Sequence, residues 1–136
     1  MNKLLAGAAM TALLSLPFQV QADVFGDGLV ALQQGNQARA IQIWKTLAEQ
    51  GDAESQVTLG FLYDTAQGVP EDLERAHHWY QRAAAQGNVI AEVNLAMMYE
   101  LGDGVKQDLA EARRFYRLAA SRGDSQSIKW LMAQRN

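Results

Sequence analysis

Five side chains capable of acid–base or metal chemistry lie within one short stretch of the chain: Glu71, Asp72, Glu74, His77 and His78. Imidazole and carboxylate groups bind zinc and serve enzymes as general acids and bases. Adjacent residues of a helix point about 100° apart, so one metal ion cannot easily take both imidazoles. Beyond the i,i+4 pair of Glu74 and His78, no third ligand lies at a recognisable metal-site spacing. Whether these side chains form a chemical site or have a structural role depends on the elements that carry them.

Those elements belong to an internal repeat with a period of 36 residues. Residues 52–87 align without a gap on residues 88–123, residues 36–51 repeat the second half of the unit, and residues 124–136 repeat the first half. The matching positions include Leu59 and Leu95, Tyr63 and Tyr99, Gly68 and Gly104, Asp72 and Asp108, Ala76 and Ala112, Tyr80 and Tyr116, and Gly87 and Gly123.

The repeat explains the polar residues of that stretch as structural parts. His77 and His78 fall on Arg113 and Arg114 of the next copy, which is typical of a solvated helix face. Asp72 recurs as Asp108 where a helix N-cap is expected, and Glu111 three residues later completes a capping-box pattern. Catalytic carboxylates should be special to one place, whereas these positions are periodic. We therefore expect no catalytic residue, no metal ligand, no cofactor and no enzymatic activity.

Each 36-residue unit is predicted to form two helices. In the first helix Ser55, Leu59, Leu62 and Tyr63 share one face at helical spacing. The second helix buries its apolar and small residues and ends at a glycine suited to a left-handed conformation. These residues are Leu73, Ala76, Trp79, Tyr80, Ala83 and Ala84, with Gly87 and Gly123 at the helix ends.

Residues 23–35 predict one more amphipathic helix, through Phe25, Leu29 and Leu32, and no segment shows strand periodicity. A single unit cannot bury its apolar face alone, so the units must stack. The fold class is all-α: a short α-solenoid of antiparallel helix pairs, with about six helices. The predicted divisions are an N-terminal hairpin (23–51), two repeats (52–87 and 88–123) and a capping helix (124–136).

Residues 1–22 have the composition of a secretory signal peptide. Lys3 precedes an apolar run from Leu4 to Leu16, and small residues stand at the cleavage site before Asp23. The run is short for a membrane span, although an uncleaved anchor is the alternative. Cleavage after Ala22 would give a periplasmic or secreted domain, residues 23–136, with no membrane insertion.

The composition excludes several classes of partner. The chain has 15 acidic and 12 basic residues and a formal net charge of −3, without a basic stripe, which argues against nucleic acid and anionic membranes. It has no cysteine, so disulfides, thiolate metal sites and a thiol nucleophile are absent. The fold must be held together by its apolar core.

The repeat, with Gly-Val before the capping Asp and Trp/Phe-Tyr before paired alanines, resembles the Sel1-like repeat, a relative of the tetratricopeptide repeat. The resemblance covers residues 36–136. It implies an interaction protein that holds a partner protein or peptide on a curved helical surface, as an adaptor, assembly factor or regulator. Ala66 stands where Gly102 stands in the next copy, so we expect a looser turn there.

Five apolar residues of the first helices are not required by the repeat pattern. They lie on the side of the helix opposite Leu59. In tetratricopeptide-like solenoids that side lines the concave surface. With an acidic rim they would suit a hydrophobic peptide or helix with basic flanks. The alternatives are packing on the N-terminal helix or on a second copy of the chain. The five residues are Val57, Phe61, Ile90, Val93 and Met97, and the rim is Glu54, Asp64 and Glu100.

Two other roles remain as alternatives. One is an immunity-type inhibitor that neutralises a toxic effector, a role for which the resemblance offers precedents. The other is a small hydrolase, because some exported relatives are described as hydrolysing β-lactams. Those relatives carry a disulfide in every repeat, whereas this chain has no cysteine and no catalytic constellation.

Overall fold

The computed structural model describes the backbone of residues 18–135 and the side chains of residues 24–135. This part of the chain forms seven α-helices and no strand. The all-α solenoid is confirmed, with one helix more than the six expected. The helices are α2 (Phe18–Gln33), α3 (Gln37–Glu49), α4 (Ala53–Thr65), α5 (Leu73–Ala84), α6 (Val89–Leu101), α7 (Leu109–Ser121) and α8 (Ser125–Ala133).

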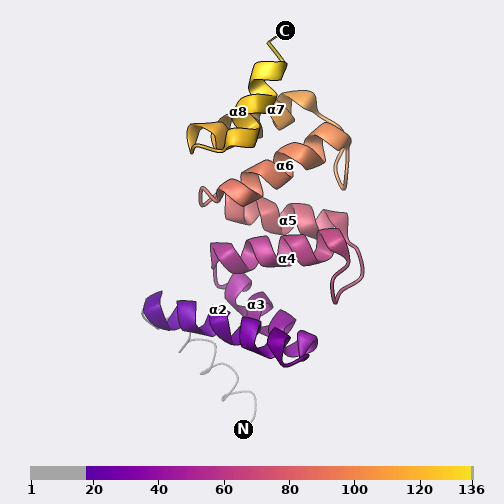
Figure 1. The fold of residues 1–136 in the computed structure, drawn as a ribbon. Coiled ribbons are helices and arrows are strands. Elements are labelled where there is room, and N and C mark those ends of the chain that lie inside the picture. The colour runs from indigo at the N-terminus through magenta and orange to yellow at the C-terminus, as the bar shows by residue number, and fades with distance from the viewer. Residues whose placement is uncertain (1–17, 136) are drawn as a thin grey trace.

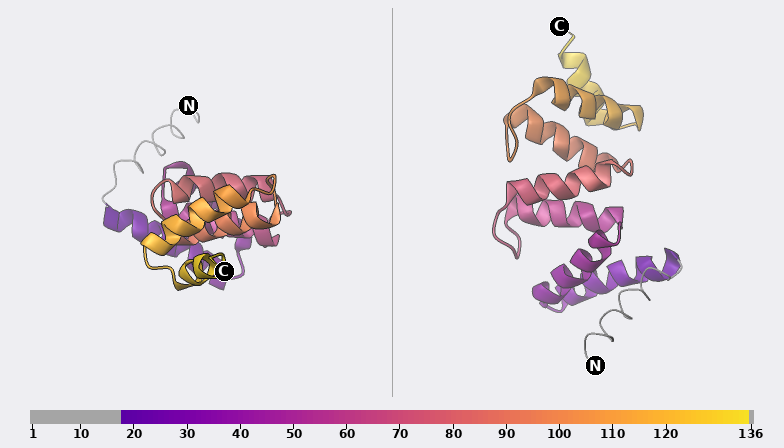
Figure 2. Two further views of the ribbon diagram at one scale, coloured as in Figure 1. Left: turned by 90° about the horizontal axis from the view of Figure 1, so that it is seen from above. Right: turned by 180° about the vertical axis from the view of Figure 1, so that it is seen from behind.

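The helices stack along one axis. Each packs mainly on its neighbours in sequence, so the pairs α2–α3, α4–α5 and α6–α7 follow one another and α8 closes the far end (Figure 1). Figure 2 shows the same stack from above and from behind. Two clusters of buried residues form the core, and Val69 and Trp79 contact both of them. The apolar interior therefore runs through the stack, as expected for repeats that cannot fold singly.

Asparagine and aspartate side chains begin the helices from α3 to α8. Asp72 accepts a hydrogen bond from the backbone N–H of Arg75, as predicted. Asp108 accepts from the N–H groups of Ala110 and Glu111. The other caps are Asn36, Asp52, Asn88 and Asp124. Side-chain oxygens thus satisfy N–H groups that have no partner within the helix.

The turn after α4 differs from the prediction. Ala66 adopts the left-handed conformation (φ 55°, ψ 37°) and its N–H donates to the carbonyl oxygen of Leu62. Gly102 ends α6 in the same way (φ 77°), with its N–H on Met98. The first turn is therefore not looser. Ala66 keeps the repeat geometry at a conformational cost of about 1 kcal/mol, which a glycine would avoid.

The buried face of α2 also differs from the prediction. Leu29 and Leu32 are exposed, whereas Gly28 and Ala31 are buried. A Cβ atom at Gly28 would overlap the Trp44 indole, so the helix approaches α3 along its small residues. Of the three apolar residues expected there, only Phe25 packs on the core. The prediction assigned the buried face to the large side chains. It was wrong because α2 and α3 pack closely, and only small residues fit between them.

Most of the predicted signal peptide, residues 1–17, lies outside the described residues. Helix α2 begins at Phe18 and continues past Ala22, the predicted cleavage position. Cleavage there remains a prediction.

Candidate partner-binding surface

The first helices of the pairs share a register that includes α2. Gly28 lies against Trp44, and Gly60 lies against Tyr80, one period further on. Because the α2–α3 turn is shorter than the α4–α5 turn, Gly28 and Gly60 are 32 residues apart instead of 36. The shortened turn hides this correspondence from a fixed period, and the aromatic contacts reveal it.

In this register one exposed apolar side chain recurs on three successive first helices. Leu29 of α2 and Met97 of α6 are each 45% exposed, and Phe61 of α4 is 47% exposed. One turn earlier, Phe25, Val57 and Val93 are half-buried. Because about half of each of these side chains faces solvent, packing within the described part of the chain accounts for only part of its apolar character.

Helix α6 widens this surface at both of its ends. Ile90 is 60% exposed and Leu101 is 64% exposed, at helical spacings of seven and four residues from Met97. We call the whole surface the first-helix strip. It contains the five residues proposed from sequence and two that were missed, Leu29 and Leu101. The strip is Leu29, Val57, Phe61, Ile90, Val93, Met97 and Leu101.

The described residues leave the exposed members of this strip open to solvent, whereas Val57 packs partly on the core. Helix α2 lies beside α3 and leaves Phe61 and Met97 about half exposed, so packing on the N-terminal helix does not account for them. Contact with a partner protein or with a second copy of the chain stays a prediction for these side chains.

Two of the three acids expected at the rim hold the helix pairs together. Asp64 accepts a hydrogen bond from the Tyr80 hydroxyl at 3.4 Å. Glu100 accepts from the Tyr116 hydroxyl at 2.7 Å and from Nε1 of Trp130 at 2.8 Å. Burial, assisted by these carboxylates, raises the pKa of both tyrosines above the ordinary value of 10.0.

Glu54 differs from these two carboxylates. It is exposed at the start of α4 and borders a hollow with Ile90 of α6. Of the three acids predicted for the rim, Glu54 is therefore the exposed one.

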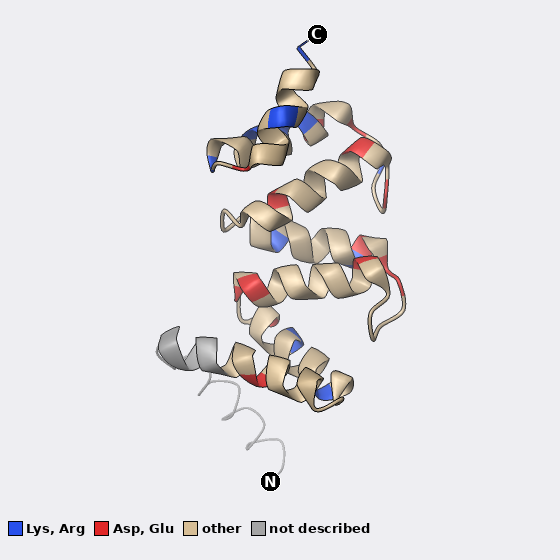
Figure 3. Cartoon of the chain, viewed as in Figure 1, with Lys and Arg blue, Asp and Glu red and all other residues tan. Residues whose placement is uncertain are grey.

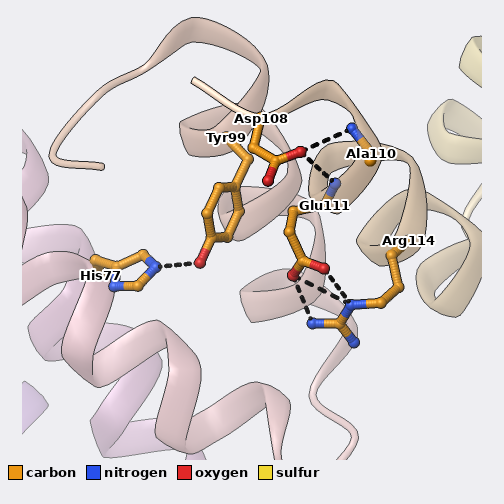
Figure 4. Close-up of polar contacts among 6 residues, drawn as sticks. All are labelled: His77, Tyr99, Asp108, Ala110, Glu111 and Arg114. Atoms are coloured by element: carbon orange, nitrogen blue, oxygen red, sulfur yellow. Dashed lines mark hydrogen bonds and ion pairs between the residues drawn. The ribbon is translucent and has the colours of Figure 1, made fainter. Parts of the chain in front are cut away.

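His77 takes part in a joint between two repeats (Figure 4). Nε2 of His77 on α5 lies 3.2 Å from the hydroxyl oxygen of Tyr99 on α6, and the two rings meet edge to face. Burial, with a smaller effect of His78, lowers the pKa of His77 from 6.5. His78 is exposed and lies beside Trp79. In the described part of the chain, no three His, Cys, Asp or Glu side chains are grouped to hold a metal ion.

Figure 4 also shows how the second copy uses its acids. Glu111 does not complete a capping box with Asp108. Its carboxylate instead pairs with the guanidinium of Arg114 one turn later, at 3.0 Å. The backbone N–H of Asp108, which a capping box would use, donates to the carbonyl oxygen of Tyr99 and is not free for Glu111. Both side chains of the Glu111–Arg114 pair are partly exposed, so the pair adds little to stability.

A buried polar pair at the joints was not visible in the sequence. Gln56 is buried, donates from Nε2 to the Ala48 carbonyl and accepts from Nε2 of Gln86. One period later, Glu92 is buried and Oε1 accepts from Nε of Arg122 at 3.0 Å. Partners 30 residues apart in sequence cannot be matched without the fold.

Along residues 18–135, each helix is either too short or too polar to cross a membrane.

Comparisons with known proteins agree with this architecture. A model of the Sel1 repeat matches residues 22–52, 53–88 and 89–124, so the N-terminal hairpin also counts as a repeat. A Sel1 repeat protein from Oxalobacter formigenes is 27% identical with a TM-score of 0.81, and the match covers 98% of this chain and 99% of that one. The comparison with curated proteins gave no match.

Two further solved structures are similar. The protective antigen c5321 of uropathogenic Escherichia coli, which displays an SLR fold, is 35% identical with a TM-score of 0.73. That match covers 79% of this chain but only 24% of the antigen. Cysteine-rich protein B of Helicobacter pylori is 22% identical over 74% of this chain and 76% of its own, with a TM-score of 0.69, and shows the fold alone.

Proposed function

Because the chain belongs to the Sel1 repeat family, we propose that it is an exported interaction module that binds another protein through the first-helix strip. Sel1 repeats are typically protein–protein interaction modules and generally non-catalytic scaffolds. We propose a role as an adaptor, assembly factor or regulator without enzymatic activity, in the periplasm or outside the cell.

The observation that carries this proposal is the recurrence of exposed apolar side chains at Leu29, Phe61 and Met97. The scaffold positions beside them, such as Leu59 and Leu95, are fully buried and explain the fold by themselves. Exposed apolar groups that recur along one side of a solenoid are typical of a surface that is covered by a partner.

The chemistry of the strip defines the kind of partner. An amphipathic helix or extended segment would place apolar side chains between Phe61 and Met97, on neighbouring first helices. A basic residue of the partner would meet Glu54, which is exposed beside Ile90. This acid makes no ion pair among the described residues.

A charge-insertion experiment tests the proposal. The double variant Phe61→Glu/Met97→Glu should remain folded, because both side chains are about half exposed, and should lose a partner that co-purifies with the wild-type protein. The matched control is Ala38→Glu/Ala110→Glu, which adds the same charge at exposed sites of α3 and α7. Unfolding of the first variant, or equal loss in both variants, would contradict the proposal.

Export has its own test. Cell fractionation followed by mass spectrometry should find the protein outside the cytoplasm with Asp23 as its first residue. A cytoplasmic protein that retains residues 1–22 would contradict export and leave the strip proposal standing.

A further inference from the structure

A second surface, at the opposite end of the stack from α2, has a different chemistry. A hollow of about 340 Å³ between α7 and α8 is lined by Arg113, Arg117, Leu131, Gln134 and Arg135. All three arginines are exposed. Arg113 and Arg117 lie one turn apart on α7, and Arg135 approaches from the end of α8.

The internal repeat shows what is unusual about this hollow. One period earlier, the positions of Arg113 and Arg135 are held by His77 and Tyr99, which meet across the α5–α6 joint at 3.2 Å. A histidine and a tyrosine can donate and accept in turn, whereas two guanidinium groups only donate and repel each other. The α7–α8 joint therefore lacks the acceptor that its inner equivalent contains.

The neighbouring acids do not supply that acceptor. Glu111 pairs with Arg114, and the buried Glu92 pairs with Arg122. Asp124 caps α8, and its hydrogen bonds with Ser127 lower its pKa. Among the described residues the three arginines of the hollow form no ion pair.

Positively charged residues are concentrated at this end of the molecule. Residues 109–135 contain six Lys or Arg and only two Asp or Glu, in a chain whose net charge is −3. Figure 3 shows basic residues gathered around α7 and α8. Such local excess of one sign attracts a partner of the opposite sign.

We propose that the hollow of Arg113, Arg117 and Arg135 binds the carboxylates of an acidic segment of a partner protein. Guanidinium groups fit carboxylates with two parallel hydrogen bonds, which fixes geometry as well as charge. Beside the hollow, Ile128 and Met132 of α8 are exposed at helical spacing from Arg135, so apolar side chains next to the partner's acids also find contact.

A protein segment fits this site better than other polyanions do. Nucleic acids and anionic membranes require extended basic surfaces, whereas this chain is acidic overall and its excess of basic residues is confined to one end. Leu131 inside the hollow also favours a ligand with carbon atoms beside its charges. The site is separate from the first-helix strip, so it does not depend on the function proposed above.

The test is fluorescence anisotropy with a labelled hexaglutamate peptide and a hexaglutamine peptide at low salt. The wild-type protein should bind hexaglutamate only, and added salt should weaken the complex. In Arg113→Gln/Arg117→Gln the affinity should fall about tenfold or more, since a hydrogen bond to a charged group contributes at least about 1.5 kcal/mol. Arg135→Gln, on the other helix, should also weaken binding.

The control carries the same charge change elsewhere. Arg39→Gln/Lys106→Gln removes two exposed basic residues that do not line the hollow and should change the affinity about twofold or less. Equal losses in both double variants, or no binding of hexaglutamate at low salt, would overturn the proposal. So would hollow-dependent binding of anionic lipid vesicles without peptide binding. Salt-sensitive self-association lost in Arg113→Gln/Arg117→Gln would assign the site to a second copy instead.

Discussion

The two full repeats, 52–87 and 88–123, place the same backbone around different polar chemistry. In the first, the buried Gln56 is neutral, and both its amide groups have hydrogen-bond partners. In the second, the equivalent Glu92 has a carboxyl group that pairs with Arg122 through Oε1 and leaves Oε2 without a partner among the described residues. The two joints thus carry different polar pairs at equivalent positions.

The strip behaves in the opposite way. Across the same two repeats Phe61 and Met97 differ in shape but remain apolar and about half exposed. At the polar joint the side-chain chemistry differs between the two copies, whereas at the exposed position of the strip the apolar character is kept. This contrast is the physical reason for placing function on the first helices.

The largest expected effect on the free energy of unfolding distinguishes the buried core from the first-helix strip. Leu95→Ala should lower the free energy of unfolding by about 4 kcal/mol, because the side chain is fully buried and its removal leaves a cavity. Met97→Ala, two residues away, should change it by about 0.5 kcal/mol or less. Urea denaturation of both variants measures the difference. Similar losses would show that the strip is core.

The polar joint can be converted from one chemistry to the other. Gln56→Glu should cost about 3 kcal/mol, because it buries a charge without a cationic partner and removes the donor to Ala48. Adding Gln86→Arg should recover at least half of that loss by recreating the pair of Glu92 and Arg122. A double-mutant cycle measures the coupling. Zero coupling would mean that the two joints are not equivalent.

Exchanging alanine and glycine in the turns of the two repeats should have a smaller effect on stability. Ala66→Gly should stabilise the protein by about 1 kcal/mol, and Gly102→Ala should destabilise it by about as much, since both positions are left-handed. Thermal unfolding compares the two variants. A loss of stability in Ala66→Gly would contradict the strained turn.

The smallest effect concerns pH and the α5–α6 joint. Burial lowers the pKa of His77 from 6.5, so the unfolded chain binds its proton more readily than the folded one. This histidine's contribution to stability should be complete above pH 6.5 and decline as the pH falls through that value. His77→Gln should lack this part of the decline, and His78→Gln should retain it. Identical pH profiles for both variants would be inconsistent with a lowered pKa of the half-buried His77.

Sequence periodicity predicted most of the helices and their ends, because the caps, turns and core positions occur in both copies of the repeat. Asp72 and Asp108 cap their helices as expected, and Gly87 has a positive φ of 80° at the predicted helix end. The face of α2 was mispredicted because Gly28 and Ala31, not the large Leu29, meet α3.

Long-range contacts limited the prediction of the surface. The strip could be proposed from helical geometry, but the hydrogen bonds that occupy Asp64 and Glu100 come from tyrosines on other helices. The correspondence of Leu29 with Phe61 depends on a shortened turn that a fixed period misaligns. These hydrogen-bond partners and this correspondence between helices could therefore be identified only from the folded structure.

The central claim is that a partner covers the first-helix strip. It is tested most directly by placing a photo-crosslinking amino acid at Phe61 or Met97, with Ala38 and Ala110 as exposed control positions on second helices. The account predicts one and the same covalent protein adduct from positions 61 and 97 and none from the controls. Equal adducts from all four positions, or adducts only with a second copy of the chain, would contradict it.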